Sequence, residues 1–152
     1  MQVALADTGP LAAWFNAADP DHAIASEFFR SYRGVLLTTW PVITEVTHLL
    51  RPAAQVKFLA WVRAGGARVE ALSPAGLEAI ERLIAKYADL PMDFADASLV
   101  HAAETLDIGE VVTFDARGFE SYRYLGQRRF VNLLPDLRAR RARRRRAKAG
   151  PA

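Results

Sequence analysis

Short apolar runs alternate along this chain with longer segments in which hydrophobic residues recur every three or four positions. The short runs predict strands, at 3–6, 35–39, 68–72, 110–114 and 129–132. The longer segments are typical of amphipathic helices, at 11–15, 21–32, 41–50, 55–64, 73–87 and 93–106. Because strands and helices alternate, the pattern predicts an α/β fold with a mainly parallel central sheet flanked by helices.

The helix that begins near Asp93 combines a small apolar face with two acids in its first turn. Ala95, Leu99 and Ala102 recur at helical spacing, which predicts tight packing on that face. Asp93 and Asp96 lie three residues apart on one side of the helix, where they could share a cation or repel each other. Two acids so placed also cap the free N–H groups of a first turn. Both interpretations stay open at this point.

The helix at 55–64 carries hydrophobic residues on more than one face. Such a width predicts burial on two sides. Either the core of this chain or a partner chain would supply the second side, and the sequence favours neither.

Four acids stand where the chain leaves a strand or enters the next helix. Asp7 and Asp115 directly follow strands, and Glu45 and Asp96 lie in the first turns of helices. Because crossover connections bring such positions to one edge of a parallel sheet, we expect these side chains to gather. Gathered carboxylates raise one another's pKa and destabilise the fold unless a cation lies among them. Asp7 would also suit a simple turn or helix cap.

The residue types available restrict the chemistry of such a site. The chain has no cysteine and three histidines, so carboxylate oxygens favour Mg²⁺ or Mn²⁺ over zinc. Such a site suits phosphodiester hydrolysis, in which a metal activates a water and stabilises the leaving oxygen. The glycine-rich motifs of nucleotide-binding loops and a serine nucleophile elbow are both absent from the sequence.

Composition places the chain among globular proteins. A length of 152 residues fits one domain, and 51% hydrophobic with 24% charged residues is typical of a packed fold. No apolar run approaches the roughly 18 residues that a membrane span requires, and the N-terminus carries no basic leader. We therefore expect a soluble protein of the cytoplasm.

The formal net charge of +3 conceals two parts of opposite sign. Residues 1–137 hold twelve Lys or Arg against seventeen Asp or Glu, whereas 138–152 hold eight basic residues and no acid. This asymmetry predicts a polyanionic partner, although a solvated charge run without a partner is the simpler interpretation. With almost nothing apolar to bury, the tail should be disordered or at most extend a short helix. Its candidate nucleic-acid contacts are Arg138, Arg140, Arg141, Arg143, Arg144, Arg145, Arg146 and Lys148.

Four segments in chain order resemble the successive motifs of PIN domains. They are DTGPL (7–11), TWPVITE (39–45), MDFADASL (92–99) and TFDARGF (113–119). The likeness runs from residue 1 to about 134 and is closest to the VapC-type toxins of bacterial toxin–antitoxin pairs. The basic segment 138–152 runs past the usual end of the domain, which bears on how RNA or an antitoxin is held.

The resemblance implies a PIN-like three-layer fold and a metal-dependent endoribonuclease that cuts single-stranded or loop RNA. Thr8 and Thr113 match hydroxyl positions that support the acids, and Asp93 matches an additional acid of some members. The resemblance also implies a homodimer and a VapB-type antitoxin inserted into the acidic groove. The residues that match the family's acids are Asp7, Glu45, Asp96 and Asp115.

We therefore predict a nuclease domain over 1–137 that uses Mg²⁺ or Mn²⁺, with a basic tail over 138–152. Glu45 is either a further ligand or the base that orients the water. Two other functions stay open: a non-catalytic RNA-binding module whose acids are helix caps, and a metal-dependent phosphatase or DNA nuclease. The predicted metal ligands are Asp7, Asp96, Asp115 and, as an additional acid, Asp93.

Overall fold

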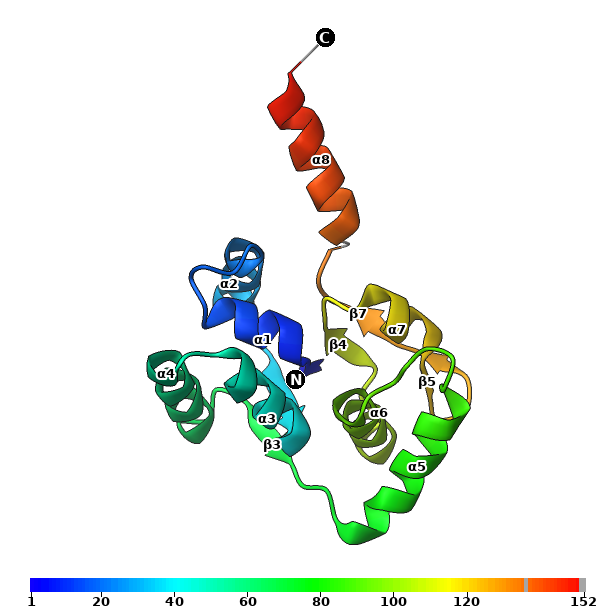
Figure 1. Ribbon diagram of the computed structural model, residues 1–152. Helices are drawn as coiled ribbons and strands as arrows, with labels where there is room; N and C mark the ends of the chain where they lie inside the picture. Colours follow the sequence, from blue (N-terminus) through cyan, green and yellow to red (C-terminus); the bar gives the residue numbers. More distant parts are fainter. Residues whose placement is uncertain (136, 151–152) are drawn as a thin grey trace.

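Five parallel strands form the central sheet of the computed structural model, which describes residues 1–135 and 137–150 (Figure 1). Their order in the sheet is β3-β2-β1-β4-β7, and every pairing in it is parallel. The predicted α/β fold with a parallel sheet flanked by helices is confirmed. The strands are β1 (Val3–Ala6), β2 (Val35–Thr39), β3 (Arg68–Glu70), β4 (Glu110–Val112) and β7 (Val131–Asn132).

The segment predicted as the last strand, 129–132, is divided between two sheets. Its first residue belongs to β6 (Arg128–Arg129), which pairs antiparallel with β5 (Arg123–Tyr124) in a separate hairpin. Leu125 and Gly126 both have positive φ, 43° and 89°, and they turn the chain between these strands. A leucine rarely adopts this conformation, so the hairpin lacks the Asn-Gly type of signal that reveals such turns in a sequence.

The helices begin and end close to the predicted limits, with three differences. The first helix begins at Thr8, directly after its N-cap Asp7, and not at residue 11. The fourth helix begins three residues early because Pro52 occupies its first position, where a missing N–H costs nothing. The seventh was not predicted, since six residues are too few for a periodic signal. The helices of the body are α1 (Thr8–Trp14), α2 (His22–Ser31), α3 (Trp40–Leu49), α4 (Pro52–Arg63), α5 (Leu77–Lys86, after the short 3₁₀ helix Pro74–Gly76), α6 (Phe94–Leu106) and α7 (Ala116–Ser121).

The small face of α6 packs as the sequence predicts. Ala95 is 2% exposed, and Ala97, Ala102 and Ala103 are buried at 1% or less. These small side chains allow α6 to lie against α3, α5 and β2 at once. The acids in the first turn of α6 are thereby held at the edge of the sheet.

The apolar surface of α4 is only partly covered. Phe58 is fully buried, whereas Val56 is 68% exposed and Leu59 is 44% exposed. The core of this chain therefore covers one side of α4 and leaves the other side open. The interpretation in which the core of this chain buries both sides of α4 is therefore wrong, and a partner chain that covers the second side stays a prediction.

The basic tail forms α8 (Leu137–Ala149) over most of its length, and Figure 1 shows this helix extending away from the rest of the molecule. The structure here differs from the sequence-based expectation, which was a disordered tail or at most the extension of a short helix. Ala, Arg, Lys and Leu all have high helix propensity, so a helix forms here without an apolar face to bury. Residues 136, 151 and 152 lie outside the described ones, and the domain boundary after 137 stays a prediction.

Throughout the described part of the chain, no helix has both the length and the apolar character needed to cross a bilayer.

Candidate active site

Asp7 is the buried acid of the site. It follows β1, caps the N-terminus of α1 and is 7% exposed. Its Oδ1 accepts a hydrogen bond from the backbone N–H of Thr8 at 2.8 Å, and its Oδ2 accepts one from the Thr113 hydroxyl at 2.7 Å. Burial raises the pKa of Asp7 to about 6 against these two bonds, and the charges of Asp115 and Asp93 add to the rise.

Thr113 connects Asp7 to Asp115 across the end of β4. While its hydroxyl donates to Asp7, the same oxygen accepts the backbone N–H of Asp115 at 2.9 Å. Asp115 is exposed and caps α7 by accepting the N–H of Gly118 at 3.1 Å. A Cβ atom at position 118 would lie 2.3 Å from Oδ2 of Asp115, so a larger residue there would force this carboxylate to move.

Glu45 reaches the site from α3. Its Oε2 accepts a hydrogen bond from the Thr8 hydroxyl at 2.7 Å. Burial raises the pKa of Glu45, the bond from Thr8 opposes the rise, and the nearby carboxylate of Asp93 adds to it. Thr8 therefore has two roles, since its backbone N–H holds Asp7 and its hydroxyl holds Glu45.

Asp93 and Asp96 form a reciprocal capping box at the start of α6. Asp93 Oδ1 accepts the N–H of Asp96 at 2.8 Å, and Asp96 Oδ2 accepts the N–H of Asp93 at 3.2 Å. The capping interpretation is thus confirmed. Burial nevertheless raises the pKa of Asp96 to about 8, and the charges of Asp7, Asp93 and Asp115 contribute to this rise. An ordinary exposed cap has no such perturbation, because its hydrogen bonds favour the ionised form.

The acids predicted from the sequence share one electrostatic environment. The charges that act on Asp96 come from the end of β1, from the start of α6 and from the end of β4. Among the described residues, however, no three Asp, Glu, His or Cys side chains are arranged to hold a metal ion. The carboxylates accept hydroxyl and backbone N–H groups of the chain instead, and their role as metal ligands stays a prediction.

Tyr122 is a component of the site that the sequence did not reveal. It is 1% exposed at the end of α7, and its ring packs edge to face on Tyr87 at 5.1 Å. Burial raises the pKa of its phenol, and the charges of all four aspartates of the site add to the rise. The hydroxyl therefore stays protonated and can donate a hydrogen bond. Tyr122 follows a six-residue helix that has no periodic pattern, so no sequence signal indicated it.

Two further polar contacts fix the strand ends that carry the acids. The Asn132 side chain accepts the N–H of Thr113 at 3.3 Å and donates to its carbonyl at 3.1 Å, which secures the end of β4. The hydroxyls of Thr39 and Ser98 lie 2.6 Å apart and join the end of β2 to α6. Both contacts link segments distant in the chain, which is why periodicity did not show them.

Open hollows flank the acids on two sides. One of about 520 Å³ is lined by Glu45 together with the exposed aromatic side chains of Trp40 and Phe94. Another of about 280 Å³ lies beside Asp115 and includes Arg117. A substrate longer than a single phosphate group therefore has room on either side of the carboxylates.

The basic residues predicted to contact nucleic acid lie on α8, which extends away from the body that carries the carboxylates (Figure 1). Residues 142–150 of this segment are exposed. The side chains of Arg138, Arg140 and Arg141 lie outside the described part of the structure.

Comparison with known proteins shows similarity to a curated ribonuclease in sequence and to a solved toxin in structure, while no family model matches the chain. Ribonuclease VapC26 of Mycobacterium tuberculosis is 35% identical over 129 residues, which cover 82% of this chain and 96% of that protein. The crystal structure of VapC20 of the same organism, described as a sarcin–ricin loop cleaving toxin, matches with a TM-score of 0.75 at 24% identity. That match covers 88% of this chain and 100% of the other, and it bears on the fold alone.

Proposed function

The chain belongs to the VapC family of PIN-domain ribonucleases, and we propose that it is an endoribonuclease toxin that hydrolyses single-stranded or loop RNA with Mg²⁺ or Mn²⁺. The observation that carries this proposal is the convergence of Asp7, Asp96 and Asp115 from three separate segments into one electrostatic environment. Folding brings these like charges together against their repulsion, and a bound cation would offset that cost.

The donor chemistry of the site fits such a cation. Its candidate ligands are carboxylate oxygens, which suit a hard divalent ion better than zinc. In the proposal Asp7, Asp96 and Asp115 hold the ion, and Asp93 is an additional ligand. When bound, the ion would polarise the phosphate and lower the pKa of a water molecule.

The chain's own residues orient these groups and move the proton. Thr113 holds Oδ2 of Asp7, and Thr8 holds Oε2 of Glu45. The raised pKa of Glu45 brings its proton affinity closer to neutrality, where a general base is most effective. Glu45 is therefore proposed to orient the attacking water and accept its proton. The protonated phenol of Tyr122 supplies a neutral donor beside the acids.

The capping box of α6 favours one rival function, in which the acids are only helix caps and the protein binds RNA without cutting it. A cap stabilises its helix best when it is ionised, because it then complements the positive end of the helix dipole. Asp96, with a pKa of about 8, is mostly protonated at pH 7 when no cation is bound. Protonation is unfavourable for a cap. It arises from burial and from the charges of the neighbouring acids, which a bound cation would offset, so the enzyme is the better hypothesis.

Cleavage of a single-stranded RNA oligonucleotide in Mg²⁺, in Mn²⁺ and in EDTA tests the proposal. Wild type should cleave only with metal. Asp96→Asn should lower the rate on the order of 10³-fold, since several kcal/mol of charge stabilisation depend on the bound ion. Glu81→Gln, an exposed acid on α5, is the matched control and should cleave normally.

Cleavage by Asp96→Asn at the wild-type rate would show that the acids are caps. Preferential hydrolysis of single-stranded DNA or of a phosphate monoester in the same assay would instead support the DNA nuclease or phosphatase alternative.

The proposal extends to partners and location. VapC toxins act on RNA and pair with VapB antitoxins, and we propose the same for this chain in the cytoplasm. An antitoxin arginine would suit the site, because a guanidinium fork matches the paired oxygens of carboxylates.

A further inference from the structure

We propose that α8 is an RNA-binding arm, which contacts substrate phosphates outside the carboxylate site and does not read the base sequence. The inference rests on the proposed function for the identity of the polyanion. It adds to that function a second binding element, on a part of the chain separate from the acids.

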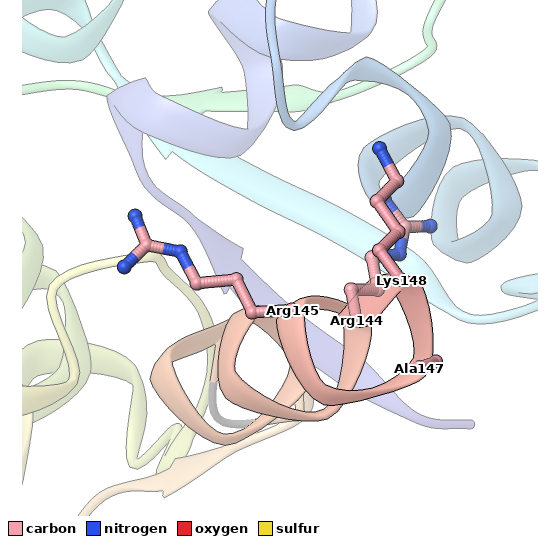
Figure 2. A pocket seen from close by; sticks show the side chains of 4 residues that line it. All are labelled: Arg144, Arg145, Ala147 and Lys148. Carbon is pink, nitrogen blue, oxygen red and sulfur yellow. The ribbon is translucent and has the colours of Figure 1, made fainter. Parts of the chain in front are cut away.

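The first observation is the distribution of charge on α8. Arg143, Arg144, Arg145, Arg146 and Lys148 are all exposed, and the segment 137–150 contains no acid. Figure 2 shows Arg144 and Lys148 on one side of the helix and Arg145 directed away from them. Positive charge therefore surrounds the helix instead of forming one face. Such a distribution suits a flexible phosphate backbone better than a flat protein surface.

The second observation is that α8 lacks the neighbours that would stabilise it. Arg144 and Lys148 are spaced i, i+4 and lie on one side of the helix, so two like charges repel each other there. A helix of 13 residues without packing is marginal in water. Bound phosphates would remove the repulsion between these side chains, so RNA binding should increase the helix content of the arm.

The third observation is that the body leaves these charges unpaired. The ion pairs found within the described residues join Arg82 to Glu78 and Arg128 to Asp107, and neither involves α8. Residues 1–137 have more acids than bases, seventeen against twelve, so the body by itself repels RNA. A cationic arm would offset this repulsion by releasing counterions from the phosphates.

Salt-dependent RNA binding by full-length protein in EDTA tests the arm without requiring cleavage. Fluorescence anisotropy with a labelled single-stranded RNA would give Kd between 50 and 200 mM salt. Replacing Arg143, Arg144, Arg145 and Arg146 by Gln should flatten the slope of log affinity against log salt by about 3, at about 0.7 per lost contact. The corresponding substitutions by Lys should retain the slope.

A second set of four substitutions controls for the loss of charge itself. Changing the exposed body residues Arg30, Arg51, Lys57 and Arg63 to Gln removes the same charge from elsewhere. This variant should keep the wild-type slope. In circular dichroism, RNA should increase the helical signal of wild type more than that of the variant with Gln on α8.

Equal slopes of log affinity against log salt for wild type and the variant with Gln on α8 would overturn the inference. The arm would then bind an acidic protein or have no partner. The proposed function is judged separately, by cleavage in Mn²⁺. Cleavage with equal slopes contradicts only the arm, whereas a flattened slope without any cleavage contradicts only the nuclease.

Discussion

Two threonine hydroxyls orient carboxylates that would otherwise repel each other. Thr113 donates to Asp7, and Thr8 donates to Glu45. A hydroxyl is a neutral donor, so it favours the ionised carboxylate without neutralising it. A lysine or arginine in the same place would form an ion pair with the acids. The threonines therefore preserve the negative charge that attracts a cation.

At the scale of the single residue, the raised pKa of Asp96 predicts how stability depends on pH. The pKa of Asp96 is about 8 in the fold against an ordinary value of 3.8, so between these values the folded protein binds more protons than the unfolded chain. The free energy of unfolding of the metal-free protein should therefore fall as pH rises through this range. Because Asp96 is only half-buried, we expect its contribution to be about 1–3 kcal/mol.

Urea denaturation in EDTA at a series of pH values measures this effect. Asp96→Asn, which carries no titrating group, should lose less stability between pH 4 and 8 than wild type does. Glu81→Gln should follow wild type. Identical pH profiles for wild type and Asp96→Asn would contradict the assigned environment of Asp96.

At the scale of the element, α6 joins the acids to the sheet. Its first turn carries Asp93 and Asp96, and further along it Ala103 is fully buried. The hydroxyl contact between Ser98 and Thr39 adds a polar link to the end of β2. The position of two acids therefore depends on how closely the small face of α6 approaches its neighbours.

A larger side chain on this face should disturb both stability and activity. Ala103→Leu would overpack the core and should lower the free energy of unfolding by about 1–3 kcal/mol. RNA cleavage should fall too, because a shifted α6 displaces Asp96. Thr105→Leu adds similar bulk on the exposed side of the same helix and is the control. Equal unfolding free energies for the two variants would show that the close packing of α6 is not required.

At the scale of the whole molecule, the apolar side of α4 indicates an interface. Val56 and Leu59 lie three residues apart on one face of α4 and are 68% and 44% exposed, and Leu49 at the end of α3 is also exposed. Exposed apolar residues grouped in this way mark interaction sites more often than single exposed residues do. Because the family resemblance implies a homodimer, we expect a second copy of the chain to cover this surface.

Light scattering after size exclusion would measure this association. Wild type should be dimeric, and Val56→Glu combined with Leu59→Glu should give a folded monomer. Leu106→Glu, at a 40% exposed position on α6, should leave the dimer intact. A wild-type monomer would contradict the homodimer, and a dimer that resists the α4 substitutions would move its interface elsewhere.

The sequence by itself determined the features that depend on local pattern. Apolar runs and periodic segments indicated the parallel strands and most helices, and the spacing of Ala95, Leu99 and Ala102 indicated the buried face of α6. The position of Asp7 after a strand indicated an acid at the edge of the sheet. Burial of one face of a strand or helix leaves a short-range pattern in a sequence, because side chains return to the same face with a fixed period in each.

Only the tertiary structure decided which groups meet. The hydrogen bond from Thr113 to Asp7 spans 106 positions, and no local pattern records such a pairing. Tyr122 was missed because its place in the site depends on contacts with distant segments, whereas the hairpin of β5 and β6 was missed because its turn at Leu125 lacks the usual sequence signal. The helix of α8 shows the converse case, in which helix propensity outweighed the lack of an apolar face. A pKa, too, depends on the distances between charges, so the sequence supplied the acids and the fold supplied their interaction.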